Sequence, residues 1–268
     1  MGNTYTGMGG TVDGANTVRT WSTSETEENK PYNASNTLGG TGQLGGIKDW
    51  SGSYTQYGHT PTHFPGDTIT FVGFDGANKT TGSAIISQVE ITANQESGDI
   101  ESITVTLAGN GALTHTTGTI TDSTLPNPPS SLSLKVELAE TDTFTELDDV
   151  RSWTLTIACD LKEYASSSTS GWKKRKAGNI TASGSISFYN QDVRTAPDIG
   201  DVRKLRLYVT STLFYLIHWA RFGEGAYETS IEGAELASGT ANWNWSGFNA
   251  GVAGTITKPD TTEWWPAA

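Results

Sequence analysis

Apolar and polar residues alternate over short stretches along most of the chain, and segments rich in Gly, Thr, Ser and Asn separate these stretches. The alternation is clearest from Trp153 through Leu155 and Ile157 to Cys159. A period of two residues is typical of a strand with one buried face. No stretch has a helical period over more than a few residues, so the sequence predicts an all-β fold with at most a short helix. Besides the strands at Trp21 and Trp153, the expected strands are 49–57, 68–74, 82–92, 99–107, 132–138, 182–189, 205–209, 213–222 and one around 243–245.

One sequence pattern occurs twice. Val-Arg-Thr-Trp ends at Trp21, and Val-Arg-Ser-Trp ends at Trp153, 132 residues later. Farther along, Gly66-Asp67 matches Gly200-Asp201 at an offset of 134. Because such matches at a nearly fixed offset are hard to obtain by chance, the sequence indicates a tandem duplication of a domain-sized unit. Other identical residues at the offset of 132 are Lys30 and Lys162, Tyr32 and Tyr164, Gly39 and Gly171, Gly46 and Gly178, Gly52-Ser53 and Gly184-Ser185, and Tyr57 and Tyr189.

The duplication predicts two β-sandwich or partial-barrel domains, residues 1–124 and 132–268. The first begins with an arm, 1–16, that has little to bury and is expected to be loose unless a neighbour orders it. Residues 125–131 are a linker, because dense Pro favours extended backbone and cannot sit inside a sheet. The second domain ends in a tail with two adjacent Trp residues. The expected repeated core positions are Trp21, Tyr32, Tyr57, Trp153, Tyr164 and Tyr189.

The net charge of −12 at pH 7 is unevenly distributed. Residues 1–132 carry 4 basic and 12 acidic side chains, and residues 133–268 carry 13 and 17. Affinity for nucleic-acid phosphates depends on clustered Lys and Arg. The composition therefore disfavours a protein that grips DNA or RNA, and an acidic surface would repel polyanions.

The first residues have neither the basic end nor the apolar centre of a secretion signal. The longest apolar run, 213–220, is far too short to span a bilayer. We therefore expect no membrane partner and a role inside the producing cell or in a particle assembled there. The only cysteine, Cys159, cannot form an internal disulfide, and its place in the alternation predicts a small buried strand residue.

No set of residues indicates catalysis or cofactor binding. His59 and His63 lie four apart, but Pro61 disfavours a helix between them, and a metal site needs three or four converging ligands. Residues 40–45 fit the pattern GxGxxG, yet no apolar strand enters this segment and no helix leaves it. There is no nucleophile elbow and no Cys–His arrangement. We expect no catalytic, cofactor-binding or metal-binding residues and no enzyme activity.

Two long polar segments, 31–46 and 165–178, occupy equivalent places in the two copies. The second contains Gly171, Trp172 and the strongest basic cluster of the chain, Lys173, Lys174, Arg175 and Lys176. This cluster is either a solvated loop tip or a loop that docks on an acidic surface, for which the acidic first copy is a partner. In the first copy the segment has the uncharged Gly39, Gly40 and Gly42.

The order of these motifs resembles that in the tail tube (major tail) proteins of long-tailed bacteriophages. Domains of that family begin with a strand close to Val-Arg-Ser-Trp and continue with a polar loop that holds Gly-Trp. They then have Gly-Ser before an aromatic strand, Gly before an apolar strand, and a final Gly-x-Gly-Ala-Leu. The matching parts here are 150–153, 171–172, 184–189, 200 with 205–209, and 107–113 of the first copy. The second copy ends less typically, and the first lacks the basic Gly-Trp cluster.

The resemblance implies sheets that join side by side into a ring, and rings that stack into the hollow tail tube of a virion assembled in the bacterial cytoplasm. It implies self-association, partners of the tape measure, tail terminator and distal tail types, and passage of DNA without specific binding. The contact loops between rings would contain Gly39, Gly40, Gly42, Gly171, Trp172, Lys173, Lys174, Arg175 and Lys176. Because each chain has two tube domains, we expect three chains per ring with pseudo-sixfold symmetry.

Two other classes of function stay open from the residues alone. The nine Trp residues would suit a carbohydrate-binding or adhesion module made of two β-sandwiches. A pair of carboxylates could in principle cleave a glycoside.

Overall fold

The computed structural model describes residues 3–33, 40–58, 60–94, 102–119, 135–189, 197–228, 238–259 and 263–265. The described chain is built almost entirely of strands, so the predicted all-β fold is confirmed. Its helical residues are a single 3₁₀ turn, Ser167–Thr169.

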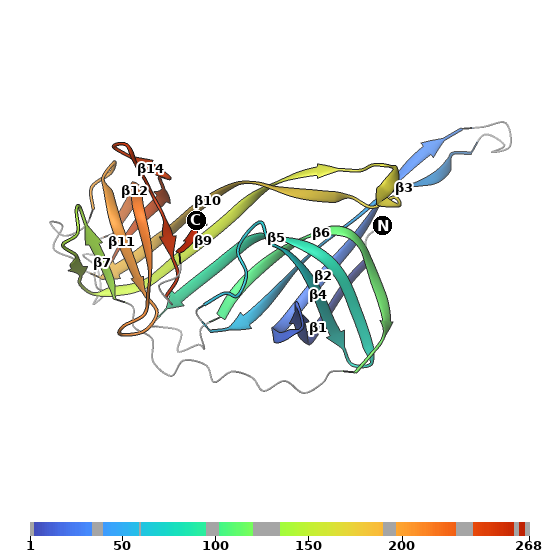
Figure 1. Ribbon diagram of the computed structural model, residues 1–268, viewed down its shortest axis with the longest axis horizontal. Helices are drawn as coiled ribbons and strands as arrows, with labels where there is room; N and C mark the ends of the chain where they lie inside the picture. Colours follow the sequence, from blue (N-terminus) through green and yellow to red (C-terminus); the bar gives the residue numbers. More distant parts are fainter. Residues whose placement is uncertain are drawn as a thin grey trace.

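Six strands of the first repeat close into a barrel. Their order is β4-β1-β2-β3-β6-β5, and β5 pairs back with β4. All neighbours are antiparallel, and successive strands from β2 to β6 are joined along the chain as hairpins or short crossovers (Figure 1). The strands are β1 (Asn3–Val12), β2 (Ala15–Tyr32), β3 (Gly42–Tyr57), β4 (Thr68–Asp75), β5 (Asn78–Asn94) and β6 (Ser102–Thr117).

The second repeat has the same strand order but stays open. Its strands β9-β10-β13-β12-β11-β7 correspond to β2-β3-β6-β5-β4-β1 of the first repeat, and β8 is added beyond β7. In the described residues no pairing joins β9 to β7 or β8. A two-stranded ribbon, β14 with β15, and the short strands β16 and β17 are added near the end of the chain. The bounds are β7 (Val136–Ala139), β8 (Thr145–Leu147), β9 (Val150–Tyr164), β10 (Lys174–Tyr189), β11 (Val202–Tyr208), β12 (Phe214–Glu228), β13 (Ser238–Trp245), β14 (Phe248–Asn249), β15 (Val252–Ala253), β16 (Ile256–Thr257) and β17 (Glu263–Trp265).

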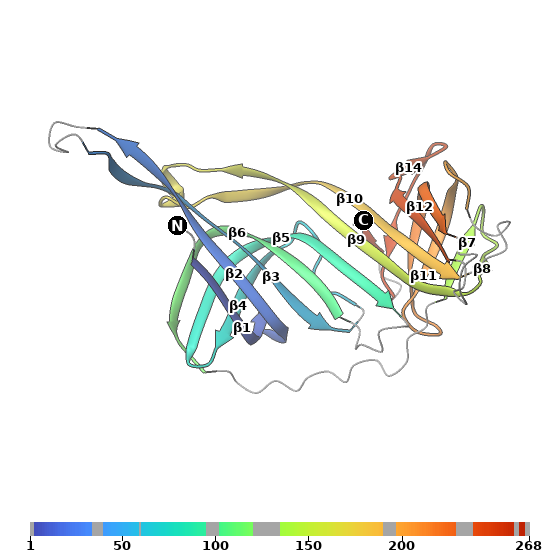
Figure 2. The same ribbon diagram turned by 180° about the vertical axis from the view of Figure 1, so that it is seen from behind.

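The two repeats share one continuous sheet. β5 of the first repeat pairs antiparallel with β9 of the second, from Gln88 opposite Ala158 to Asn94 opposite Ser152. Figures 1 and 2 show the repeats at opposite ends of the molecule, with the hairpin of β9 and β10 running from the second repeat across the first. The hairpin of β2 and β3 points the same way and projects beyond the barrel.

The core follows the alternation in the sequence. Along β9 every second residue from Trp153 to Cys159 is buried, as the period of two predicts. The most deeply buried large side chains include Trp50, Trp153 and Trp243. Buried residues of both repeats form a single apolar cluster, so the shared sheet also joins the two cores.

Several sequence predictions need correction. The arm expected at 1–16 is largely strand β1, because pairing with β2 and β4 satisfies its backbone without requiring large apolar side chains. The segment 31–46 is not simply a loop, since β2 runs to Tyr32 and β3 starts at Gly42. The expected linker, 125–131, lies outside the described residues.

Candidate assembly surfaces

The two repeated Trp residues make the same contact in their respective repeats. The indole nitrogen of Trp21 donates to the carbonyl of Phe74 at 3.2 Å, and that of Trp153 donates to the carbonyl of Tyr208, also at 3.2 Å. Phe74 and Tyr208 are themselves 134 residues apart. The tryptophan on β2 thus bonds to β4, and the tryptophan on β9 bonds to the equivalent strand, β11.

Smaller contacts repeat in the same way. Ser22 hydrogen-bonds to Ser53 at 3.1 Å, and at the equivalent place Thr154 hydrogen-bonds to Ser185 at 3.0 Å. The guanidinium of each Arg in the repeated motif lies over a ring, Arg19 over Tyr57 at 4.4 Å and Arg151 over Tyr189 at 5.4 Å from the ring centroid. The repeats therefore share side-chain geometry as well as strand order.

The Gly-Asp pairs anchor the equivalent turns. Gly66 and Gly200 both have positive φ, 103° and 94°, which glycine adopts without strain. Gly66 donates to the carbonyl of Ile86 at 2.8 Å, and Gly200 donates to the carbonyl of Phe222 at 2.9 Å. These bonds make Ile86 on β5 and Phe222 on β12 equivalent, at an offset of 136.

The junction of β5 and β9 has one buried and one partly exposed face. Ala93 lies opposite Trp153, Ile91 opposite Leu155 and Val89 opposite Ile157, and all six are buried. Glu90 opposite Thr156 faces the other way and is partly exposed. Each exposed strand edge presents unpaired backbone donors and acceptors, and here two edges from different repeats satisfy each other.

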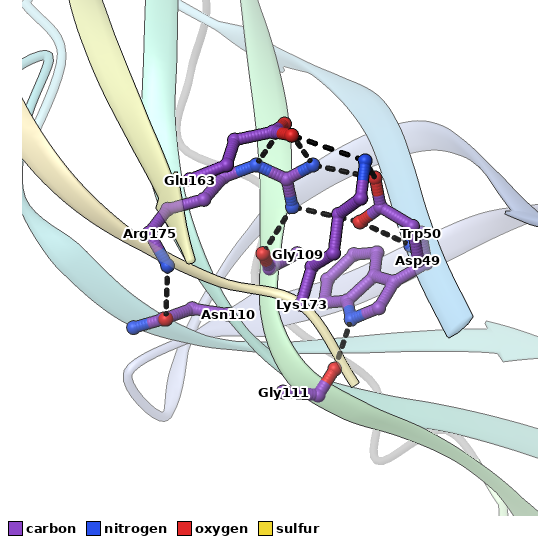
Figure 3. A network of polar contacts seen from close by, with 8 residues as sticks. All are labelled: Asp49, Trp50, Gly109, Asn110, Gly111, Glu163, Lys173 and Arg175. Atoms are coloured by element: carbon purple, nitrogen blue, oxygen red, sulfur yellow. Dashed lines mark hydrogen bonds and ion pairs between the residues drawn. The ribbon is translucent and has the colours of Figure 1, made fainter. Parts of the chain in front are cut away.

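The hairpin of β9 and β10 is held on the first repeat by Arg175 (Figure 3). The Arg175 guanidinium makes a two-pronged contact with Asp49 of β3, at 2.8 Å and 2.6 Å. It also donates to Glu163 of its own hairpin, at 3.1 Å and 2.7 Å, and to the carbonyl of Gly109. The Arg175 backbone nitrogen donates to the side chain of Asn110 at 3.0 Å. Such a bidentate arginine–carboxylate pair is both directional and strong.

Neighbouring backbone bonds support the same docking. Lys48 of β3 donates to the carbonyl of Gly171 at 2.8 Å, and Lys173 donates back to the carbonyl of Lys48 at 2.9 Å. The Lys173 ammonium lies 3.0 Å from Glu163 and 3.6 Å from Asp49. The tip of the hairpin therefore extends the sheet edge of the first repeat as well as pairing with its charges.

The charges of this cluster adjust one another. Hydrogen bonds from Lys173 and Arg175 lower the pKa of Glu163, and the contact with Glu163 raises the pKa of Lys173. Burial by itself would lower the pKa of Arg175, but the hydrogen bonds to Asp49 and Glu163 raise it. Glu163, Lys173 and Arg175 are thus held in their charged forms at neutral pH.

These positions do not test the predicted contacts between rings. Arg175 and Lys173 contact the first repeat of the same chain, Lys174 pairs with Tyr164 across the hairpin, and Lys176 is exposed. Trp172 packs partly buried against the core, with the Lys48 ammonium 5.8 Å from its ring centroid. In the first repeat Gly40 is exposed, Gly42 begins β3 opposite Tyr32, and Gly39 lies outside the described residues. A role of these residues between rings stays a prediction.

Two of the expected core positions are wrong. Tyr32 is 38% exposed and Tyr164 is 43% exposed, because they lie where the two hairpins extend past their sheets. Trp21 and Trp153 are buried, and Tyr57 and Tyr189 are half-buried beneath the Arg side chains. A shared residue type at a fixed offset marks equivalent positions, but it does not distinguish core from surface.

Features of other function classes are weak in the described chain. Its Trp side chains of known burial, residues 21, 50, 153, 172, 219, 243 and 245, are buried or half-buried, so they form no exposed platform for sugars. The residues that the structure describes contain no group of three His, Cys, Asp or Glu side chains placed to hold a metal ion. No helix in these ranges is long and apolar enough to cross a membrane.

Comparison with models of known protein families and with curated proteins gives no match.

Proposed function

We propose that the protein is a structural subunit that joins its sheets edge to edge into rings, and that the rings stack into the tail tube of a long-tailed bacteriophage. The observation that carries the proposal is the junction of β5 and β9. It links two equivalent repeats through backbone hydrogen bonds, as neighbouring subunits of a ring would be linked.

The order of the repeats supports continuation of this sheet. The β2–β3 hairpin of the first repeat and the β9–β10 hairpin of the second point the same way, so successive copies would add head to tail in the same sense. Repetition of one head-to-tail contact closes a ring when its rotation allows. Six repeats supplied by three chains would give a ring with pseudo-sixfold symmetry.

The charge suits a conduit for DNA. A net charge of −12 per chain repels a polyanion, so DNA would pass such a surface without being held. Specific binding would require clustered basic side chains, but Lys173 and Arg175 of the strongest cluster are paired with Asp49 and Glu163.

Negative-stain electron microscopy of the purified chain tests the proposal. We expect six-lobed rings or hollow tubes, and a mass of three chains per ring by light scattering. Monomers that stay dispersed at high concentration, and that bind a glycan array, would contradict it in favour of a carbohydrate-binding module.

A further inference from the structure

Equivalent edges of the two repeats are covered by different strands. In the second repeat, β9 residues 152–158 pair with β5 residues 88–94 across the junction. In the first repeat, the matching β2 residues 20–25 pair with Asn3–Met8 of β1. Gly7 lies opposite Trp21, where Ala93 lies opposite Trp153. The start of β1 therefore occupies the place that a neighbouring repeat occupies on β9.

The second repeat has a matching edge that no strand of the described residues covers. Since Ile86 is equivalent to Phe222, the junction segment 88–92 of β5 corresponds to 224–228 of β12. This part of β12 pairs with β13 on one edge. On the opposite edge, pairing to the β11 side stops at Phe222, and none of the described strands continues it. One chain thus carries both edges of a second junction, on β2 in the first repeat and on β12 in the second.

The start of β1 has no fully buried side chain. Its side chains from Asn3 to Met8 are exposed or partly exposed, and Met8 is 73% exposed. A depression of about 500 Å³ lies beside Tyr5, Trp21 and His115, so packing beneath this strand is incomplete. Tyr5 packs against the core and Gly7 lies on the ring of Trp21, so a strand that replaces these residues must cover Trp21 again.

A hinge separates this segment from the rest of β1. Gly9 has φ of 84°, and the register with β2 shifts between Gly10 and Val12, where β1 also pairs with β4. Residues 10–12 can therefore stay in the barrel while the residues before Gly9 move. Glycine supplies the backbone freedom that such a change requires.

We propose that Asn3–Met8 is a displaceable cover strand, and that β12 of a second copy replaces it on β2 during assembly. The internal junction sets the register. Glu90 lies opposite Thr156 in that junction, and their equivalents are Ala226 and Ser24. Ala226 of the second copy would therefore lie opposite Ser24. The projecting β2–β3 hairpin would then lie across the second repeat of that copy, as β9 and β10 lie across the first repeat within the chain. This inference rests on the proposed function, and it specifies which edges meet.

A disulfide lock tests the displacement. In a Cys159→Ala background, Thr4→Cys with Ser24→Cys would tie the cover strand to β2, since these residues are direct partners and such pairs lie within reach of a disulfide. We expect the oxidised variant to assemble at least tenfold less than its reduced form. The matched control, Glu90→Cys with Thr156→Cys, locks the internal junction and should assemble equally in both states.

A second pair tests the register directly. Ser24→Cys combined with Ala226→Cys, again without Cys159, should give covalent dimers and trimers when assembled protein is oxidised. Shifting one partner to Gly223→Cys should abolish the ladder.

The outcomes separate the two proposals. Rings that form while Thr4 and Ser24 are locked, or that give no Ser24–Ala226 ladder, overturn the cover-strand inference and leave the proposed function standing. A chain that stays monomeric in every variant, including one that lacks residues 2–8, overturns both.

Discussion

The two repeats share six equivalent strands in the same order, but the first closes into a barrel and the second stays open in the residues that the structure describes. The difference lies in which strand covers the edge of the Trp-bearing strand. In the first repeat β1 covers it, and in the second a strand from the other repeat does. The comparison teaches that a repeat of this kind can complete its sheet either from within or from a neighbour, with the same backbone pairing.

The largest expected effect comes from removing the two equivalent indoles. Trp153→Ala should destabilise the protein by about 4 kcal/mol and Trp21→Ala by about 3 kcal/mol, since each leaves a large cavity and an unpaired carbonyl. Trp153 should matter more because it lies opposite Ala93 in the junction. Equilibrium unfolding in urea measures both values. Equal costs would mean that the junction adds nothing to the packing of Trp153.

Arg175→Ala should have the next largest effect, because it leaves Asp49 and Glu163 without their main partner. We expect a loss of about 2 kcal/mol, below the value for a fully buried pair, since Glu163 is 46% exposed and solvent screens its share. Hydrogen exchange should then rise at the tip of the β9–β10 hairpin. Lys176→Ala, at an exposed neighbouring site, is the control and should change stability by less than about 0.5 kcal/mol.

Acid should weaken the same docking. The pKa of Glu163 is lowered in the folded protein, so its contribution is complete above the ordinary glutamate pKa and is lost as the pH falls through the lowered value. The stability difference between the wild type and Glu163→Gln should therefore be largest near pH 7 and shrink below about pH 4. Urea unfolding of both proteins across this range measures it. A difference that grows with acid would contradict the assignment.

The smallest effect is expected at the two exposed tyrosines. Tyr32→Ala and Tyr164→Ala should each change the free energy of unfolding by less than about 0.5 kcal/mol, because surface side chains contribute little. Thermal unfolding followed by circular dichroism is sufficient. A loss of stability comparable to that of Trp21→Ala would mean that both tyrosine side chains belong to the core.

The sequence predicted what depends on local pattern. Alternation gave the fold class and located most strands, and the fixed offset paired Trp21 with Trp153. The ends of the hairpins were missed because strands that project from the barrel have no buried face, so residues 25–32 lack an alternating signal. The N-terminal strand was missed for a similar reason, since apart from Tyr5 and Val12 it contributes backbone pairing rather than apolar side chains to the core.

Partner choice was beyond the sequence. Alternation along β9 shows that one face is buried, but it does not say whether β1, β7 or β5 lies beside it. The contact of Arg175 with Asp49 joins residues 126 positions apart. The sequence predicts either a solvated loop tip or a loop that docks on the acidic first copy. Only the folded geometry shows that Arg175 binds the carboxylate of Asp49.

Fusion of two repeats in one chain has a kinetic consequence. The junction of β5 and β9 forms inside a single molecule, so its formation does not depend on protein concentration. In the proposed ring of three chains, half of all junctions would already exist before any two molecules meet. Of the three junctions between chains, two would form by encounters in solution and the third would close the ring within the assembled trimer, so dilution would oppose only two steps.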